Sequence, residues 1–229
     1  MTNKKIIITK NGPYLVPKEF PLSREKIVIN EEGSPEKWQE TEKIKTSGDY
    51  ALCRCGHSSK KPFCDGAHAK VNFNGKETAK NEPYEKNVRI IEGTELILKD
   101  KQEFCASARF CDKCAGTWAL TEDSADPDSK KMAIETACNC PSGRLVCCNK
   151  KTNNEIEPNF EKSLVLVEDP QKKVSGPIWV KGKIAVVSSE GKEYEVRNRV
   201  TLCRCGTSEN KPFCDGSHIP AGFKDKPKG

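Results

Sequence analysis

Short runs of β-branched and other apolar residues recur along the chain, separated by clusters of glycine, proline, asparagine and aspartate. Runs of this kind between turn-forming clusters are typical of β-strands. The pattern predicts strands over residues 5–9, 25–30, 96–99, 163–167, 178–180, 183–187 and 194–196. Between the last two, Glu190-Gly191 predicts a hairpin turn, because glycine readily adopts the positive φ that such turns need. We therefore expect a mainly β protein.

Helical signals are few. Pro62 and Pro212 each predict the start of a short helix, because proline suits the first helical position, where an N–H would have no partner. A longer helix is expected over residues 127–137, which present a patchy apolar face. Trp118 and Trp179 follow strand-like patterns and are expected to be core aromatics. The fold class that results is mainly β with a few short helices.

The amino-acid composition suggests that bound metal stabilises the fold. The 229 residues are only 35% hydrophobic, yet 13 are cysteines, an odd number that excludes complete internal pairing. A thin apolar core with many thiols suggests that bound metal contributes to the fold. No apolar run approaches the roughly 20 residues of a membrane span, and the amino terminus lacks the features of a signal peptide. We therefore expect a cytoplasmic protein.

Charge argues against a nucleic-acid partner. The net charge is +6, but acids and bases are interleaved along the chain. Such interleaving is typical of a mixed, solvated surface rather than of a basic binding face.

An internal repeat organises the chain. Residues 50–68 and 200–218 match at 13 of 19 positions without a gap, and a phenylalanine follows each final histidine by five residues. Gly12-Pro13 before the first repeat has a fainter echo in Gly176-Pro177 before the second. The pattern predicts two related units, 1–80 and 161–229, on either side of a different block, 81–160.

Each repeat places four metal-binding side chains at fixed spacing, Cys-x-Cys-x8-Cys-x3-His. The first two cysteines lie two apart on an extended stretch, so their sulfurs project to one side. The third cysteine and the histidine, four apart on the expected helix, share one face. Three cysteines and one histidine suit either a tetrahedral zinc ion or a [2Fe-2S] cluster. The candidate ligands are Cys53, Cys55, Cys64 and His68 in the first repeat, and Cys203, Cys205, Cys214 and His218 in the second.

The residues between these ligands carry a resemblance. Cys64-Asp65-Gly66-Ala67-His68 and Cys214-Asp215-Gly216-Ser217-His218, each preceded by Lys-Pro-Phe and by Cys-Arg-Cys-Gly, resemble the CDGSH iron–sulfur (NEET) family. The resemblance implies a [2Fe-2S] cluster in each repeat, with the Cys-x-Cys pair on one iron and the Cys-x3-His pair on the other. Single-motif members pair as homodimers, so a tandem chain resembles such a dimer fused into one polypeptide, with two modules in a pseudo-twofold arrangement.

The histidine ligands and their neighbours carry further expectations. A neutral imidazole in place of a thiolate should raise the reduction potential, and its protonation should make the cluster acid-labile. Asp65 and Asp215 are expected to brace the ligand helix, and Gly66 and Gly216 to let backbone approach the cluster. His57 is expected to be an ordinary loop residue, because Thr207 occupies its place in the second repeat. Four nearby cations are read as solvated side chains rather than as partners of the cluster: Arg54, Lys61, Arg204 and Lys211.

The central block holds seven more cysteines and three interpretations compete for it. A thioredoxin-like site lacks the surrounding βαβ pattern, and a zinc ribbon lacks a second C-x2-C pair. Cys140-Pro141 and the Cys105-x5-Cys111 spacing resemble a divergent single-cluster ferredoxin-like domain, a small α+β insert. That resemblance implies a candidate third cluster on Cys105, Cys111 and Cys140, with Cys114 or Cys138 as fourth donor. The alternative is a degenerate domain of packed thiols, and Cys147 and Cys148 are assigned to packing.

Taken together, the sequence predicts a non-enzymatic iron–sulfur protein acting in electron transfer, redox sensing or cluster transfer. Its expected partner is a redox protein or an apo-protein that accepts a cluster, with neither nucleic acid nor membrane involved, and the chain is expected to be a monomer. One alternative is a zinc-binding interaction module. Another is a thiol redox enzyme using the central cysteines, although the chain has no G-x-G-x-x-G and no P-loop.

Overall fold

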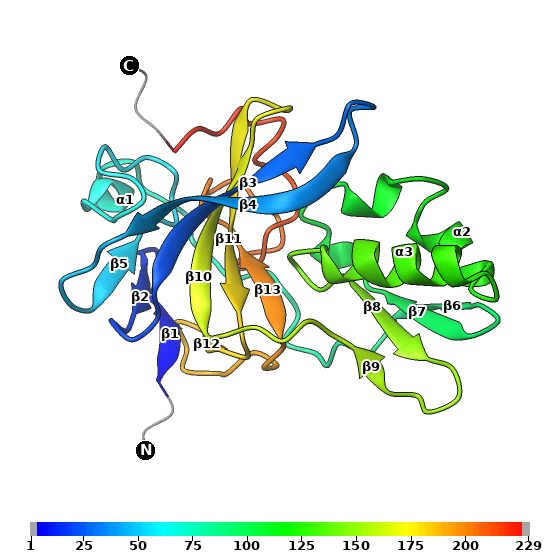
Figure 1. Cartoon of the computed structure of the whole chain (residues 1–229). Coiled ribbons are helices and arrows are strands. Elements are labelled where there is room, and N and C mark those ends of the chain that lie inside the picture. Colours follow the sequence, from blue (N-terminus) through cyan, green and yellow to red (C-terminus); the bar gives the residue numbers. More distant parts are fainter. Residues whose placement is uncertain (1–3, 226–229) are drawn as a thin grey trace.

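The computed structural model describes residues 4–225, and these form three β-sheets with a few short helices (Figure 1). The mainly β prediction is confirmed. The strands are β1 (Lys5–Ile8), β2 (Tyr14–Val16), β3 (Leu22–Ile29), β4 (Pro35–Ile44), β5 (Tyr50–Leu52), β6 (Arg89–Glu92), β7 (Leu96–Asp100), β8 (Leu145–Asn149), β9 (Glu155–Ile156), β10 (Ser163–Asp169), β11 (Val174–Lys181), β12 (Ala185–Val187) and β13 (Arg199–Leu202). The α-helices are α1 (Ala67–Lys70), α2 (Thr117–Glu122) and α3 (Pro127–Cys138).

Two of the three sheets each contain strands from both halves of the chain. One sheet has the order β12-β1-β2-β5 and the other β13-β11-β10-β3-β4. In the first sheet β1 pairs in parallel with β12, and in the second β10 pairs in parallel with β3. The second half of the chain therefore contributes β12 to the first sheet, the first half contributes β3 and β4 to the second sheet, and the expected pseudo-twofold arrangement is confirmed. We call these two sheets, with the loops that follow β5 and β13, the paired-sheet body.

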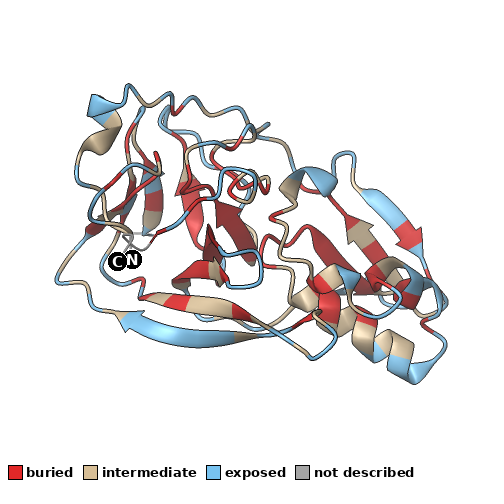
Figure 2. Cartoon of the chain, turned by 90° about the horizontal axis from the view of Figure 1, so that it is seen from above, coloured by how far each residue is buried: buried red, intermediate tan, exposed pale blue. Residues whose placement is uncertain are grey.

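One hydrophobic core lies between the two interleaved sheets (Figure 2). Alternate residues of the short strands point into it, as the strand period of two requires. Ile6 and Ile8 of β1 are buried, for example, whereas Ile7 between them is 47% exposed. The core draws on both halves, including Leu22 and Leu52 from the first and Leu164 and Leu202 from the second.

The charged strand β4 was not predicted. It pairs only with β3 and leaves most of its side chains exposed, so it carries no hydrophobic alternation. Its partly buried residue Trp38 packs against Trp179 of β11 and Phe110 of the central block, with ring centroids 5.1 and 4.9 Å apart. The Trp38 indole N–H also donates to the Asn139 carbonyl. Trp38 therefore joins the paired-sheet body to the central block.

The central region, residues 89–156, has its own sheet, β6-β7-β8-β9, with α2 and α3 beside it (Figure 1). Helix α3 begins after Asp126, whose side chain accepts the Ser129 N–H, and the prediction over 127–137 is confirmed. The expectation for Trp118 is wrong: it lies on α2, and its indole N–H donates to Asp100. None of the helices within residues 4–225 is long and apolar enough to cross a bilayer.

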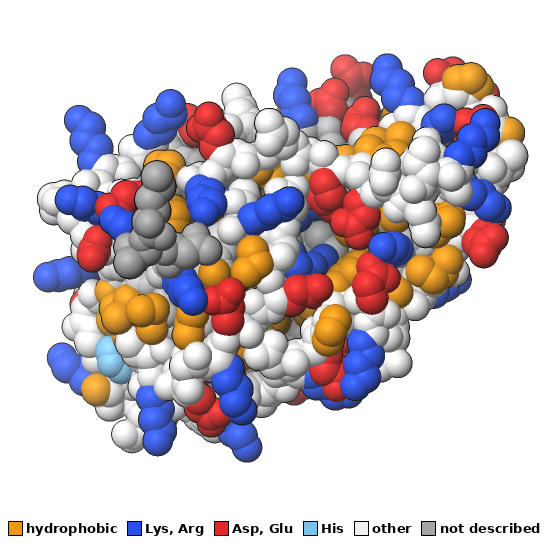
Figure 3. Space-filling model, turned by 90° about the horizontal axis from the view of Figure 1, so that it is seen from below, with side chains coloured by type: hydrophobic (Ala, Val, Ile, Leu, Met, Phe, Trp, Pro, Cys, Tyr) orange, Lys and Arg blue, Asp and Glu red, His pale blue; other side chains and the backbone are white. Residues whose placement is uncertain are grey.

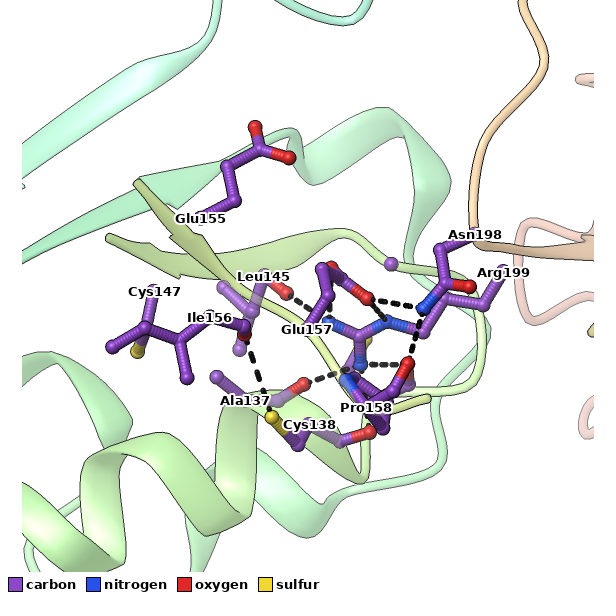
Figure 4. A network of polar contacts seen from close by, with 12 residues as sticks. Ala137, Cys138, Leu145, Cys147, Glu155, Ile156, Glu157, Pro158, Asn198 and Arg199 are labelled. Carbon is purple, nitrogen blue, oxygen red and sulfur yellow. Dashed lines mark hydrogen bonds and ion pairs between the residues drawn. The ribbon is translucent and has the colours of Figure 1, made fainter. Parts of the chain in front are cut away.

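A buried arginine fastens the central region to the body (Figure 4). Arg199, on β13, is 1% exposed and pairs with Glu157 at 2.8 Å. The same guanidinium donates to the carbonyls of Ala137, Cys138 and Cys140 at the end of α3. These carbonyls lie at or just beyond the negative, C-terminal end of the helix, which favours a cation there.

The predicted helix starts at Pro62 and Pro212 are wrong. The residue after each proline instead forms an isolated β-bridge, Phe63 with Leu52 and Phe213 with Leu202. Only α1 follows, one short turn of helix beyond the first proline, and the second repeat has turns in its place. The strand predicted over 194–196 is also absent from the described residues, whereas the Glu190-Gly191 turn is confirmed.

Candidate metal centre

The two ligand loops, residues 53–68 and 203–218, begin where β5 and β13 end. Backbone bonds fold each loop back on its strand: the Cys53 N–H donates to Pro62, and the Cys64 N–H to Ala51. The second loop repeats both bonds at the corresponding positions. This folding, rather than the helix expected from the sequence, brings the ends of each loop together.

Each loop gathers its donors as two pairs. The Cys53 and Cys55 sulfurs are 3.7 Å apart, and those of Cys203 and Cys205 are 3.6 Å apart. The Cys64 sulfur lies 3.4 Å from Nδ1 of His68, and the Cys214 sulfur lies 3.4 Å from Nδ1 of His218. In both repeats Nδ1 is thus the nitrogen that faces the third cysteine.

The pair distances indicate how many ions each loop suits. Two thiolates on one tetrahedral ion, with metal–sulfur bonds of about 2.3 Å, lie about 3.8 Å apart, close to the observed spacings. Within residues 4–225, however, no three His, Cys, Asp or Glu side chains gather closely enough to hold a single ion. Each loop therefore offers two separate two-donor sites, which fits one pair of ligands on each iron of a binuclear cluster.

Asp65 and Asp215 brace the two loops. Asp65 accepts the backbone N–H groups of Ser59 and Ala67, and Asp215 accepts those of Glu209 and Ser217. The Ser59 hydroxyl and N–H hold the pKa of Asp65 far below its ordinary value. Both carboxylates thus cross-link the loop just beside the Cys-x3-His pair.

The reading of Arg54 and Arg204 as solvated is wrong. They are 1% and 3% exposed, and their guanidinium groups tie the ligand loops to the preceding hairpins. Arg54 donates to the carbonyls of Gly12 and Thr9, and Arg204 donates to the equivalent carbonyls of Gly176 and Val167. Each arginine lies between two cysteine ligands and so places a buried positive charge beside them.

The two arginines differ in their remaining partners. Arg204 forms an ion pair with Asp225 at 2.6 Å, and Asp225 also pairs with Arg24 at 2.8 Å. Burial alone would raise the pKa of Asp225, but Arg204 and Arg24 lower it on balance. Arg54 has no acidic partner within the described residues, and its Nη1 is buried without a hydrogen bond. An anionic cluster beside Arg54 fits this uncompensated charge.

Two glycines mark the place where the loops meet. A Cβ on Gly56 would lie 2.3 Å from the Cys205 carbonyl oxygen, and one on Gly206 would lie 2.4 Å from the Cys55 oxygen. The two Cys-x-Cys segments therefore touch across the pseudo-twofold axis. The sequence marks this segment only by its repetition, since Cys-Arg-Cys-Gly is identical in both repeats.

The second site is more enclosed than the first. Cys214 and His218 are 2% and 4% exposed, whereas Cys64 and His68 are only half-buried. Burial lowers the pKa of His218 to about 4, so this imidazole is neutral and able to bind metal at neutral pH. A hydrogen bond with Cys203 lowers the pKa of Cys205 to about 6. His57 lies exposed, and only its backbone N–H reaches a cysteine ligand.

In the central region three of the candidate thiols come together. Cys105, Cys111 and Cys140 line one cavity of about 20 Å³, and burial raises the pKa of Cys111. Cys114 is exposed outside it. A cavity of this size holds about one water molecule, so as it stands it has no room for a cluster.

The other central cysteines have separate roles. The Cys138 thiol donates to the Ile156 carbonyl, and so lies apart from the three-cysteine cavity. Cys147 and Cys148 are fully buried in two different hydrophobic clusters. Their adjacent side chains face opposite sides of β8, as expected for packing residues.

The paired donors and the buried cations beside them form two metal centres, and the family comparisons below make this an iron–sulfur protein. Comparison with family profiles agrees: one described as "Iron-binding zinc finger CDGSH type" matches residues 11–69 and 175–219. A second, "Divergent 4Fe-4S mono-cluster", matches residues 91–150. The chain belongs to the CDGSH family as a tandem-motif protein with a divergent single-cluster ferredoxin-like region between its motifs. Neither the curated proteins nor the solved structures gave a match.

Proposed function

We propose that this chain holds two [2Fe-2S] clusters and acts as a one-electron carrier. The observation that carries the proposal is the grouping of donors into pairs, each spaced for one metal ion, with no set of three around one point in residues 4–225. Cys53 and Cys55 would hold one iron of the first cluster, and Cys64 and His68 the other. Cys203 and Cys205, with Cys214 and His218, would do the same in the second. When bound, each cluster supplies a centre that gains and loses a single electron.

The surrounding residues support electron transfer over catalysis. Each ligand loop packs its Cys-x-Cys segment directly against the other, through Gly56 and Gly206, which places the two sites side by side. Arg54 and Arg204 supply fixed positive charge that balances thiolate charge, and they are held by backbone carbonyls. We assign no substrate and no enzymatic reaction to the chain. Both halves of the paired-sheet body come from one polypeptide, which supports a monomer.

Iron, sulfide and zinc counts on the anaerobically purified full chain, with a visible absorption spectrum, test the proposal. Four irons and four sulfides with a [2Fe-2S] spectrum are expected. Cys64→Ser and Cys214→Ser should each remove two irons, while the matched control Cys148→Ala should remove none. Zinc without sulfide would instead establish the zinc-binding module and refute the proposal.

The same counts decide the role of the central cysteines. Because Cys105, Cys111 and Cys140 line a cavity too small for a cluster, we propose that the central region is a scaffold and derive no electron path through it. Cys140→Ser should therefore leave the iron count unchanged. A wild-type count clearly above four that falls in Cys140→Ser would show that these thiols move apart and bind a third cluster.

A further inference from the structure

The two CDGSH motifs share their sequence but not their surroundings. Lys-Pro-Phe-Cys-Asp-Gly is identical in both, and Gly66 and Gly216 have nearly the same backbone conformation, with φ of 85° and 88°. A Cβ at Gly66 would meet nothing within 4 Å, whereas one at Gly216 would lie 2.5 Å from the Ser107 hydroxyl. The difference therefore comes from what the rest of the chain packs against each motif.

Residues 103–109 of the central region, the covering segment, enclose the second site. The Glu103 carbonyl accepts the Asn210 amide, and Phe104 packs edge-on against Phe213 at 5.4 Å. Arg109 anchors the other end of the segment through two bonds to Asp169. In Figure 1 the second ligand loop lies on the side of the paired-sheet body that faces the central region.

The first site has no such cover. His68, Asn72 and Phe73 line a surface hollow of about 440 Å³, together with Lys10. A CDGSH ligand, His68, therefore lines a hollow that opens to solvent beside α1. A partner of the protein can thus approach the histidine ligand of the first site but not that of the second.

The charge around the two motifs also differs. Residues 57–72 carry three lysines and one aspartate, a net charge of +2, whereas residues 207–222 carry one lysine and two acids, a net charge of −1. Lys60 and Lys70 are exposed and form no ion pair within the described residues, and Asn210 and Pro220 replace them in the second motif. Figure 3, the view from below, shows lysine and arginine side chains spread along the left-hand end of the molecule among a few acidic ones.

From these differences we propose that the first CDGSH site is the docking face for an acidic one-electron partner protein, and that the second site is an internal one. The inference rests on the proposed function. Each exchange moves one electron, so that the partner's redox centre gains what the first site loses, and no bond is formed or broken. Lys10, Lys60 and Lys70 would attract the partner's carboxylates and raise the rate of encounter.

Small redox complexes of opposite charge test the docking face on the full, iron-loaded chain. The dithionite-reduced protein is mixed with ferricyanide, a trianion, or with tris(phenanthroline)cobalt(III), a trication, and oxidation is followed by stopped-flow absorbance. With ferricyanide we expect a fast and a slow phase, and the fast rate should fall as salt is added. Lys60→Glu with Lys70→Glu should slow this phase about tenfold or more and speed the reaction with the cobalt complex.

Controls assign the phases. Lys131→Glu with Lys151→Glu makes the same charge change on exposed residues of the central region and should leave the fast phase nearly unchanged. His68→Cys should alter the spectrum of the fast phase, and His218→Cys that of the slow phase. The proposal would be overturned if His218→Cys altered the spectrum of the fast phase, or if the fast rate fell equally in both double lysine variants.

A second measurement detects docking without electron transfer. Hexacyanochromate(III) has the charge of ferricyanide but is redox-inert, and its paramagnetism broadens NMR signals of the residues it approaches. Broadening is expected at residues 10–11 and 69–74 of the oxidised, iron-loaded chain and not at residues 219–222. Equal broadening at both motifs would refute the docking face. A chain that binds no iron would instead refute the proposed function.

Discussion

The contact between the two ligand loops predicts that Gly56→Ala is severely destabilising. The new methyl group would fall 2.3 Å from the Cys205 carbonyl oxygen, far inside van der Waals contact. That oxygen belongs to the backbone of a loop which Arg204 and several backbone bonds hold in place, so the clash cannot be relieved by turning a side chain. Overpacking of this kind costs about 1–3 kcal/mol. The positive φ of Gly56, 79°, adds about 1–2 kcal/mol for an alanine.

Gly66→Ala separates these two contributions. Gly66 has a φ of 85° but open space around its Cα, so alanine there carries the backbone cost alone. We expect the free energy of unfolding to fall by about 1–2 kcal/mol in Gly66→Ala and by about 2–5 kcal/mol in Gly56→Ala. Gly206→Ala should match Gly56→Ala, since its methyl group would lie 2.4 Å from the Cys55 oxygen.

Guanidinium denaturation of the iron-loaded variants, followed by far-UV circular dichroism without oxygen, measures the order of the midpoints. Wild type should be the most stable and Gly66→Ala intermediate. Gly56→Ala and Gly206→Ala should be the least stable and nearly equal. If Gly56→Ala unfolds at the same denaturant concentration as Gly66→Ala, the two ligand loops do not touch in solution and the reasoning fails.

Asp225→Asn should lower the free energy of unfolding at pH 7 by about 1–3 kcal/mol, because two buried arginines, Arg24 and Arg204, lose one of the carboxylates they share and keep Glu168. Since the pKa of Asp225 is lowered in the folded state, the stability that its carboxylate contributes is present above about pH 4 and is lost as the pH falls further. The urea midpoint of the variant should therefore decline less steeply below pH 4 than that of the wild type. An equal decline in both proteins would contradict this. Arg199→Lys should lower the free energy of unfolding by about 2–4 kcal/mol, because one ammonium cannot replace a side chain that bonds four carbonyls and Glu157. An unchanged midpoint of denaturation by guanidinium chloride would refute that role. Iodoacetamide should alkylate exposed Cys114 in the native protein and Cys147 only on unfolding, as peptide mass spectrometry would show; equal native rates would contradict the burial of Cys147.

The donor pairs could be predicted because their geometry is local. Two cysteines on an extended stretch and a cysteine four residues before a histidine need only their own loop to converge, and the repeat marked both sets. The helix starts at Pro62 and Pro212 failed for a non-local reason. The preference of proline for the first helical position is weaker than the backbone pairing of the next residue with the preceding strand. Phe63 pairs with Leu52, and Phe213 with Leu202, and this pairing keeps both segments extended.

Burial of charged residues could not be read from the sequence. Arg54 is buried because the carbonyls of residues 9 and 12, more than forty positions earlier, replace its solvent. Strand β4 lies at a sheet edge with most side chains in water, so its composition shows neither alternation nor apolar character. The difference between the two motifs depends on the covering segment, which contacts only one of them although their sequences agree.

The exchange of strands between the repeats has a consequence for synthesis on the ribosome. Lys5 of β1 aligns with Ala185 of β12, so one of the first strands to leave the ribosome waits for a partner 180 residues later. The central region pairs its strands within residues 89–156 and can close its sheet long before that. Non-local pairing of this kind folds slowly. We expect the middle of the chain to fold first and both iron sites to be completed together, in a late step that depends on residues 185–218.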